Sequence, residues 1–388
     1  GYYYIVNPKT NKVVNISGSY LLDLSNDTNI TLYSKSGSNE QIWCIDPISN
    51  QNYYVRSYID ENFGFNAYRY PNNNYNCNIH EIQGNTTDAA VRFVLKENNC
   101  CKIELANYPG YFLTATGETN ESDIRWQTAD KGELQIWRLD AVDLDERQNN
   151  IEAITNNIQN CSVNIIPNNR KTSAIAIAKA MLNVGYPVAF VSGMLSNIVY
   201  EGSTGEFENS NYVSNPNNKP DYLVYMDTEY NGINFYLNNY SGKTIMEVGV
   251  SSTYTMLCDL ENGSNNTWSI NGSRVGFGLG CLQWTFARTM KLVQTYREIN
   301  NYSNNITLEQ AAQAEAKMIL RELSSSEFNG IISNWKNSCG NNIDSENAAN
   351  TAGRILCQNY LRPSDPNGTK ASQRAARAAS IYSAITGS

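Results

Sequence analysis

The sequence predicts a multidomain protein in which an all-β domain is followed by an α+β domain of mostly helical structure. Residues 1–140 contain short alternating runs with turn residues about every ten positions, which is typical of antiparallel strands. From Thr172 onward the apolar residues recur at helical spacing. We therefore expect domains at 1–140 and 171–388, joined at 141–170 by a polar, Asn-rich linker with room for a short helix.

The composition excludes several classes of function. The formal net charge is -8, so the chain lacks the basic surface that nucleic-acid binding needs, and we expect no nucleic-acid partner. No apolar run approaches the ~18 residues of a membrane span, and we expect no such span. The opening GYYYIV resembles a strand and not a signal peptide, which predicts a chain that is either trimmed or not exported by that route.

The available side chains restrict the chemistry to carboxylates. His80 is the only histidine, and any Ser-His or Cys-His nucleophile scheme would have to use it. The nine cysteines include no C-x-x-C pair, so we expect structural thiols and not metal ligands. We predict neither a metal nor a cofactor.

The all-β segment contains an internal repeat. Residues 20–43 and 111–137 each begin with an aromatic-Leu strand, pass a polar hairpin, reach a second strand and close on Gln-Ile-Trp. A weaker middle unit begins at Phe63 and closes on Arg92-Phe93. Three such units predict a three-fold barrel whose shared core holds the closing aromatics Trp43, Phe93 and Trp137.

This repeat resembles the ricin-type β-trefoil, whose units carry a Gln-x-Trp signature. The resemblance implies sugar binding through an acidic residue and a stacking aromatic in each unit. Asp23 fits the Leu-Asp signature of the first unit, whereas Asn66 and Thr114 stand at the matching places of the other two. We expect at most one conventional sugar site, at Asp23, and the interpretation without any sugar site stays open.

The second domain opens with two predicted helices. The first has a Thr/Ser cap at Thr172 and ends at Gly185, and the second has Pro187 in its first turn and Gly202 just after its end. Residues 203–275 predict short strands such as YLVYM and INFYL. Further helices are expected after Arg288, after a capping box at Thr307, near 345–360 and at 371–386.

Glu201 stands at the end of the second of these helices, on the same side as Phe190, Met194 and Ile198. Partial burial and the negative end of the helix both favour the protonated carboxyl group. A general acid for glycoside cleavage must hold its proton in this way. The alternative is a frayed last turn with Glu201 in water.

The stretch GFGLGCLQWTFAR, from Gly276 to Arg288, allows three interpretations. A dinucleotide or phosphate site is disfavoured, because neither a leading parallel strand nor a Lys partner accompanies the glycines. A hairpin turn with Trp284 in the core and a wall of a substrate cleft both remain. Gln283 is the polar side chain best placed to face such a cleft.

Four motifs within residues 172–386 together resemble the phage tail lysozyme family. They are, in order, SGMLSNIVYEG, GFGLGCLQWTFAR, MILREL and NTAGRILCQNYLRPSDPNGTKASQRAARAASIY. Family members have a helix that ends in a catalytic Glu, a Gly-x-Gly-x-x-Gln-Trp-Thr motif, and a Tyr-x-Arg-Pro before an Arg-bearing helix, which is here the helix of Arg374. The resemblance implies a lysozyme-like fold and cleavage of β-1,4 linkages in the glycan strand of peptidoglycan.

The resemblance also implies roles for single residues. Glu201 matches the catalytic acid, and Gln283 matches the motif glutamine near the substrate cleft, with Gly278 and Leu279 beside it. The sequence departs from the family at Gly202, where Ser often follows the Glu.

The second carboxylate is left open by the sequence. Glu206, Glu208 and Asp227 all follow Glu201 in the loop-and-strand region. A retaining enzyme would need the second group ~5 Å from the acid, and an inverting enzyme ~6.5–9.5 Å. Cleavage by the acid alone, as in a lytic transglycosylase, is the alternative chemistry.

These features predict a peptidoglycan hydrolase that a β-trefoil module targets, located on a virion tail or as an extracellular lysin acting at the bacterial cell wall. The expected partners are peptidoglycan, cell-surface glycans and other tail proteins. A non-catalytic lectin-like adhesin and a structural tail protein are the alternatives.

Overall fold

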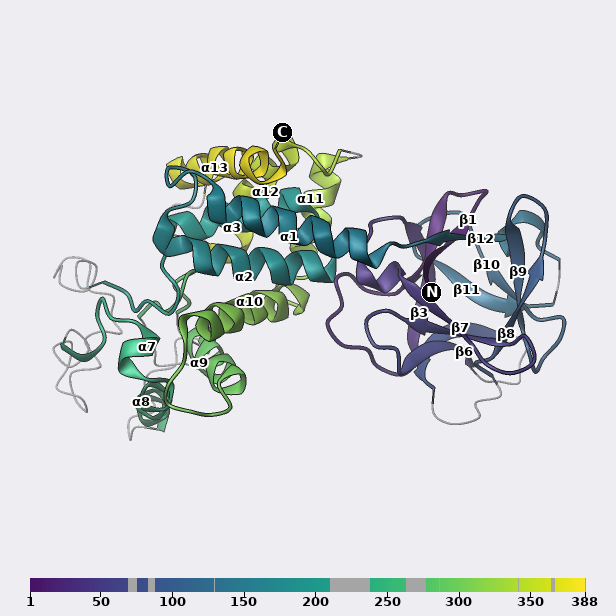
Figure 1. The fold of residues 1–388 in the computed structure, drawn as a ribbon, viewed down its shortest axis with the longest axis horizontal. Helices are drawn as coiled ribbons and strands as arrows, with labels where there is room; N and C mark the ends of the chain where they lie inside the picture. Colours follow the sequence, from purple (N-terminus) through teal and green to yellow (C-terminus); the bar gives the residue numbers. More distant parts are fainter. Residues whose placement is uncertain are drawn as a thin grey trace. The chain divides into compact units, whose positions relative to one another are not determined.

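A computed structural model gives the fold of the chain. It describes residues 1–68, 75–82, 88–128, 130–209, 238–262, 277–285, 287–340, 342–363 and 367–387. The chain forms two compact units, Gly1–Asn149 and Asn150–Ser388, and each is described by itself. The first unit consists of strands and the second mostly of helices (Figure 1).

Six strands of the first unit close into a barrel. They pair antiparallel around a ring in the order β1–β4–β5–β8–β9–β12, and β12 pairs with β1 again. Ring closure satisfies the backbone groups that an open sheet would leave at its edges. The strands are β1 Tyr2–Asn7, β4 Trp43–Pro47, β5 Tyr53–Ser57, β8 Val91–Leu95, β9 Cys100–Leu105 and β12 Trp137–Ala141.

Three hairpins complete the unit, one from each repeat. Their second strands β3, β7 and β11 pair with one another in a triangle. A six-stranded barrel with such a triangle of hairpins is a β-trefoil, which confirms the fold predicted for this part of the chain. The hairpins are β2 Lys12–Ile16 with β3 Thr28–Ser34, β6 Phe63–Tyr68 with β7 Tyr75–Glu81, and β10 Phe112–Ala115 with β11 Ser122–Gln127.

The first repeat differs from the predicted one at its first hairpin strand. This strand is Lys12–Ile16, and the predicted aromatic-Leu strand at Tyr20 lies in the bends that follow it. Gly18 and Tyr20 have left-handed backbone angles, φ 130° and 54°, which end the strand. Tyr20 is nevertheless buried, and its N–H donates to the Glu40 carboxylate at 2.9 Å.

The middle repeat closes on Val91 and not on Phe93 as the sequence predicted. Val91 pairs with Tyr53 in the same register as Trp43 pairs with Tyr3. Val91 is fully buried, whereas Phe93 is half-buried. The other two repeats close on tryptophan, so the aliphatic Val91 does not stand out in the sequence.

The two closing tryptophans bind the hairpins of their own repeats. The indole N–H of Trp43 donates to the carbonyl of Val14 at 3.0 Å, and that of Trp137 donates to the carbonyl of Leu113 at 2.9 Å. In the middle repeat the equivalent hairpin position holds Phe65, whose ring lies 4.6 Å from that of Trp43. Phe65 and Val91 are both fully buried and belong to the same core cluster as Trp43.

Helices form most of the described part of the second unit, and none is long and apolar enough to cross a membrane. Helix α3 packs against α2, α12 and α13, while α10 packs against α2 and α9 (Figure 1). The helices are α1 Leu144–Asn160, α2 Asn168–Val184, α3 Val188–Tyr200, α7 Ile245–Val248, α8 Val250–Asn262, α9 Ala287–Ile299, α10 Leu308–Ser324, α11 Gly330–Cys339, α12 Glu346–Leu356 and α13 Thr369–Thr386, with a π-helix, η3, at Cys357–Leu361.

Several boundaries differ from those that the sequence predicted. Helix α2 begins after Pro167, four residues before the predicted cap at Thr172, and α1 occupies most of the segment predicted as a linker. The predicted strands YLVYM and INFYL lie outside the described residues. The described part of 203–275 contains α7 and α8, where Thr244 and Glu247 form a capping box. The capping box predicted at Thr307 is present.

Two glycines allow α3, α12 and α13 to pack closely. A Cβ atom on Gly193 of α3 would lie 2.5 Å from the Cβ of Ala352, and one on Gly353 of α12 would lie 2.7 Å from the carbonyl oxygen of Arg374. The helix backbones therefore touch at these two places. This contact brings the C-terminal end of α3 next to α13.

The indole hydrogen bonds of the trefoil predict that replacing a buried tryptophan lowers the free energy of unfolding more than replacing an exposed aromatic residue. Trp137→Phe removes the donor to the Leu113 carbonyl, and we expect a loss of about 1–3 kcal/mol in the free energy of unfolding. Tyr108→Phe is the control, because Tyr108 is 41% exposed. Urea unfolding of the full chain measures both, and equal losses would contradict the role given to the indole.

Candidate active site

Glu201 is the C-terminal cap of a helix that is buried on all sides. Residues 189–198 of α3 are buried, Tyr200 is exposed, and the backbone N–H of Glu201 donates to the carbonyl of Ile198 at 3.2 Å. The side chain of Glu201 is 21% exposed and forms an ion pair with Arg374 of α13. Glu201 is therefore neither part of the apolar core nor splayed into water.

Burial raises the pKa of Glu201 above the usual value of a glutamate. The positive charge and hydrogen bond of Arg374 act against this increase, as do the charges of Lys370 and Arg170. The pKa remains raised because burial is the largest effect. A half-buried carboxyl group in this balance retains its proton at higher pH than an exposed glutamate does.

Arg374 is itself held by α3. Its guanidinium group is 3% exposed and donates to the Asn197 side-chain oxygen at 3.0 Å. The Asn197 amide donates in turn to the carbonyl of Gly193 at 2.8 Å. A chain of buried contacts, which we call the Asn197–Arg374–Glu201 relay, therefore fixes the carboxyl group in position. The sequence motifs included Arg374, but they did not predict this contact.

The glycine-rich stretch forms a tight hairpin. The backbones of Leu279 and Trp284 exchange hydrogen bonds of 3.0 and 2.9 Å. Gly280 has a φ of 82° and Gln283 a φ of 51°, so the turn between them requires two left-handed residues. Trp284 is buried, and its indole N–H donates to the Glu322 carboxylate at 2.9 Å.

Gln283 connects this hairpin by a hydrogen bond to the segment that follows Glu201. Its amide nitrogen donates to the carbonyls of Glu206 at 3.1 Å and Gly280 at 2.9 Å. The amide lies between two glycines, because a Cβ on Gly202 or on Gly278 would come within 2.5 Å of it. Gln283 is thus half-buried, and its amide fills the space that a side chain at position 202 or 278 would need.

Glu206 and Glu208 lie on one side of an extended segment beside the hairpin. Phe207 between them is fully buried and pairs with Leu279. Alternation along an extended chain therefore places both glutamates on the face opposite to Phe207. The Glu208 backbone and carboxylate both bind the backbone of Gly278, at 2.8 and 2.9 Å.

The two glutamates differ in their electrostatic environment. Burial acts to raise the pKa of Glu206, but hydrogen bonds from Ser203 and Arg170 outweigh it and lower the pKa. Burial raises the pKa of Glu208, and the negative charge of Glu201 raises it further, against the hydrogen bond from Gly278. Glu201 and Glu208 are therefore close enough to influence each other's ionisation.

Two predicted site residues remain, Asp227 and Asp23. Asp227 lies outside the described residues. Asp23 is exposed in the bend between β2 and β3 of the trefoil. Val14 and Leu113 occupy equivalent positions, because each carbonyl accepts the indole hydrogen bond of its own repeat. The next residues, Asn15 and Thr114, are therefore equivalent, and the strand pairing places Asn66 at the same position in the middle repeat.

Sequence reasoning missed a buried glutamate behind the site. Glu315 of α10 is fully buried and accepts hydrogen bonds from the Gly205 N–H at 2.7 Å, the Tyr296 hydroxyl at 2.8 Å and the Ser173 hydroxyl at 3.2 Å. It therefore anchors the loop that follows Glu201. An acid within the run AAQAEAKMIL, on the same helix face as Ala311 and Met318, was the available signal.

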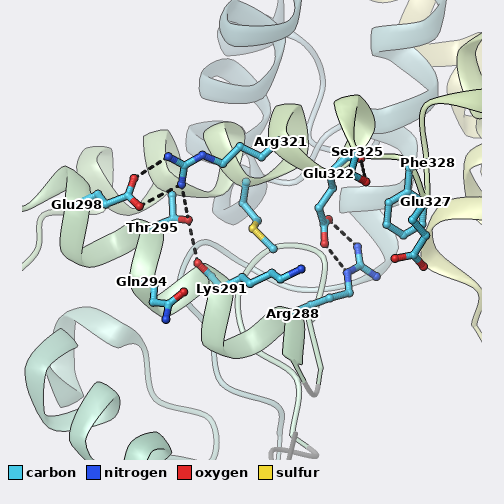
Figure 2. A pocket seen from close by; sticks show the side chains of 11 residues that line it. Arg288, Lys291, Gln294, Thr295, Glu298, Arg321, Glu322, Ser325, Glu327 and Phe328 are labelled. Carbon is cyan, nitrogen blue, oxygen red and sulfur yellow. Dashed lines mark hydrogen bonds and ion pairs between the residues drawn. The ribbon is translucent and has the colours of Figure 1, made fainter. Parts of the chain in front are cut away.

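A pocket of about 190 Å³ lies between α9 and α10 (Figure 2). The ion pairs Arg288–Glu322 and Arg321–Glu298 stand on its walls, and Lys291 lies between them. Its lining includes none of the predicted site residues. Within the described residues, no cluster of His, Cys, Asp or Glu side chains could hold a metal ion.

Comparison with protein families decides the class of the second unit. Residues 172–385, more than half of the chain, match the family model of the phage tail lysozyme. The chain belongs to the phage tail lysozyme family. The family match confirms the resemblance that the four motifs indicated, and a lysozyme-like hydrolase domain follows from it. Comparison with curated protein sequences gave no match.

The trefoil unit has weak structural likenesses among solved proteins. The designed three-fold symmetric protein ThreeFoil shares 17% identity at a TM-score of 0.33, over 36% of this chain and 99% of that one. The Rhizoctonia solani agglutinin shares 17% at 0.32, over 37% and 95%. The Macrolepiota procera ricin B-like lectin, solved with lactose, shares 18% at 0.30, over 37% and 96%. The strand pairing described above, and not these scores, carries the fold assignment.

The packing around Gln283 predicts that position 202 tolerates no side chain. In Gly202→Ala the new Cβ would lie 2.5 Å from the backbone oxygen of Gly280 as well as from Gln283. We expect a loss of about 1–3 kcal/mol in the free energy of unfolding. Gly330→Ala in α11 is the matched control, since no atom lies within 4 Å of its new Cβ. If both variants unfold at the same urea concentration as the parent, the close packing is wrong.

Proposed function

We propose that the second domain hydrolyses β-1,4 linkages in the glycan strand of peptidoglycan, with Glu201 as the general acid. The observation that carries this proposal is the half-buried Glu201 carboxyl group with its raised pKa, at the family position of the catalytic acid. Glu201 gives its proton to the glycosidic oxygen while the bond from that oxygen to the sugar carbon breaks. Membership of the phage tail lysozyme family supports this substrate class.

Glu208 is the second carboxylate in this proposal. The Glu206 carboxylate already accepts hydrogen bonds from Ser203 and Arg170, and its low pKa makes it a weak base. Glu208 has a raised pKa and repels the charge of Glu201. Because like charges repel, ionisation of one of these carboxyl groups disfavours ionisation of the other. Ionised Glu208 would then take a proton from the water that attacks the sugar carbon.

The trefoil is proposed as the module that brings the hydrolase to glycans of the bacterial surface, on a virion tail or as an extracellular lysin. The positions equivalent to the lectin acid hold the neutral side chains of Asn15, Asn66 and Thr114. Glycan recognition here would therefore use other side chains than the usual acidic residue. Binding of residues 1–149 to a glycan array, without release of sugar ends by the full chain, would favour the adhesin alternative.

The role of Glu201 predicts the activity of an isosteric variant. Glu201→Gln removes the proton donor, and we expect lysis of purified bacterial walls to fall by about 10²–10⁴-fold. Glu309→Gln, on the exposed side of α10, is the control and should lyse walls at the parent rate. Mass spectrometry of the released muropeptides identifies the bond. Anhydro products would indicate a lytic transglycosylase, and equal activity of Glu201→Gln and the parent would reject the assignment.

The two neighbouring glutamates predict opposite outcomes when each is replaced. Glu208→Gln should lower the rate of hydrolysis by about 10²-fold or more with the fold retained, because the base is lost. Glu206→Gln should retain more of the rate and mainly reduce stability, because the ion pair with Arg170 is lost. Wall turbidity and urea unfolding of both variants measure this. If Glu206→Gln loses activity and Glu208→Gln does not, Glu206 and not Glu208 is the second carboxylate.

A further inference from the structure

The relay that ends at Glu201 contains a buried positive charge, the guanidinium group of Arg374. Arg374 is 3% exposed, yet its guanidinium is divided between the neutral oxygen of Asn197 and the carboxylate of Glu201. A buried guanidinium is costly to desolvate and is compensated only by a well-formed pair. Its counter-ion here is Glu201, the carboxyl group that gives up its proton in the proposed reaction.

We propose that Arg374 is a positioning residue for the reaction: it fixes the Glu201 carboxyl group and stabilises the carboxylate that remains after the proton has left. This inference rests on the proposed role of Glu201. In the step concerned, the proton passes from Glu201 to the glycosidic oxygen, and the electron pair of the breaking bond passes to that oxygen. Glu201 then carries a full negative charge next to Arg374, which is already in place.

The geometry allows Arg374 to do this without moving. Asn197 holds the guanidinium from α3 at 3.0 Å, and the Asn197 amide is fixed by the carbonyls of Gly193 and Gly353 at 2.8 and 3.3 Å. The contacts thus come from α3, α12 and α13, whose backbones touch at the same two glycines. A preorganised charge of this kind costs no reorganisation when the acid ionises.

Other charged and titratable groups face Glu201. Lys370 on α13 and Arg170 on α2 lower the pKa of Glu201, in the same direction as Arg374. The charge of Glu201 in turn raises the pKa of Cys357 on η3 and of Glu208 in the loop that follows α3. Arg374 is the one for which a direct ion pair with Glu201 is found within the described residues.

The two effects of Arg374 can be separated by the dependence of the rate on pH. Glu201 must be protonated to act, so the rate falls as the pH rises through the pKa of Glu201. Arg374 lowers that pKa, and its removal therefore moves the falling limb to higher pH. Loss of the stabilised carboxylate lowers the maximal rate at the same time. A purely structural role of Arg374 would lower the rate without moving the limb.

The test compares pH–rate profiles of wall hydrolysis by the full chain. We expect Arg374→Met to lower the maximal rate by about 10²-fold and to move the falling limb to higher pH. Arg374→Lys keeps the charge, so its limb should stay near that of the parent while its rate is partly restored. Arg354→Met, which removes an exposed charge from α12, is the control and should leave both quantities unchanged.

A second variant keeps the test decisive if Arg374→Met does not fold. Asn197→Asp places a competing carboxylate on Arg374 and should move the falling limb in the same direction. If the variants that fold, Arg374→Met or Asn197→Asp, keep the falling limb of the pH–rate profile at the pH of the parent, the inference is overturned. If Glu201→Gln retains full activity, the proposed function fails instead, so the two failures are distinguishable.

Discussion

The ion pair between Glu201 and Arg374 is the contact on which the candidate site depends. It joins the end of α3 to α13, and Gly193 and Gly353 allow close packing of α3, α12 and α13 beside it. The pair also decides what the carboxyl group can do. Burial raises the pKa of Glu201, and the charge and hydrogen bond of Arg374 lower it. Their opposition gives an acid that keeps its proton and can still release it.

Three further glutamates of the second unit show how differently one side chain can be used. Glu315 is fully buried and binds the loop after Glu201 from behind, while Glu322 accepts hydrogen bonds from Trp284, Arg288 and Tyr360. Both acids hold the hairpin and its loop in position through donors that surround them. Glu208 accepts a hydrogen bond from the Gly278 N–H, and the charge of Glu201 acts on it. Glu315 and Glu322 therefore stabilise the site, whereas Glu201 and Glu208 are the carboxyl groups of the proposed reaction.

The sequence predicted those parts of the site that lie within one motif. Glu201 at the end of an apolar helix and Trp284 in the core both follow from local spacing. The partner of Glu201 did not, because Arg374 lies 173 residues further along the chain and only the packing of α3 on α13 brings it close. Helix α7 was missed in a segment rich in Asn and Tyr, where the short capping box at Thr244 outweighs composition. Local patterns thus selected Glu201 as the candidate acid, while tertiary contacts set the pKa of its carboxyl group.

In the trefoil, the residues that stabilise the fold are different from those that would bind a ligand. Its barrel has a buried closing residue in each repeat, and in the middle repeat this residue is the aliphatic Val91. Nothing in the barrel requires an acid at the hairpin position held by Asn15, Asn66 and Thr114. A repeat can therefore lose a sugar-binding acid without loss of stability, and the Gln-x-Trp signature reports the core of the repeat and not its ligand. In this chain the signature predicts where Trp43 and Trp137 pack, and a glycan site has to be sought from surface chemistry instead.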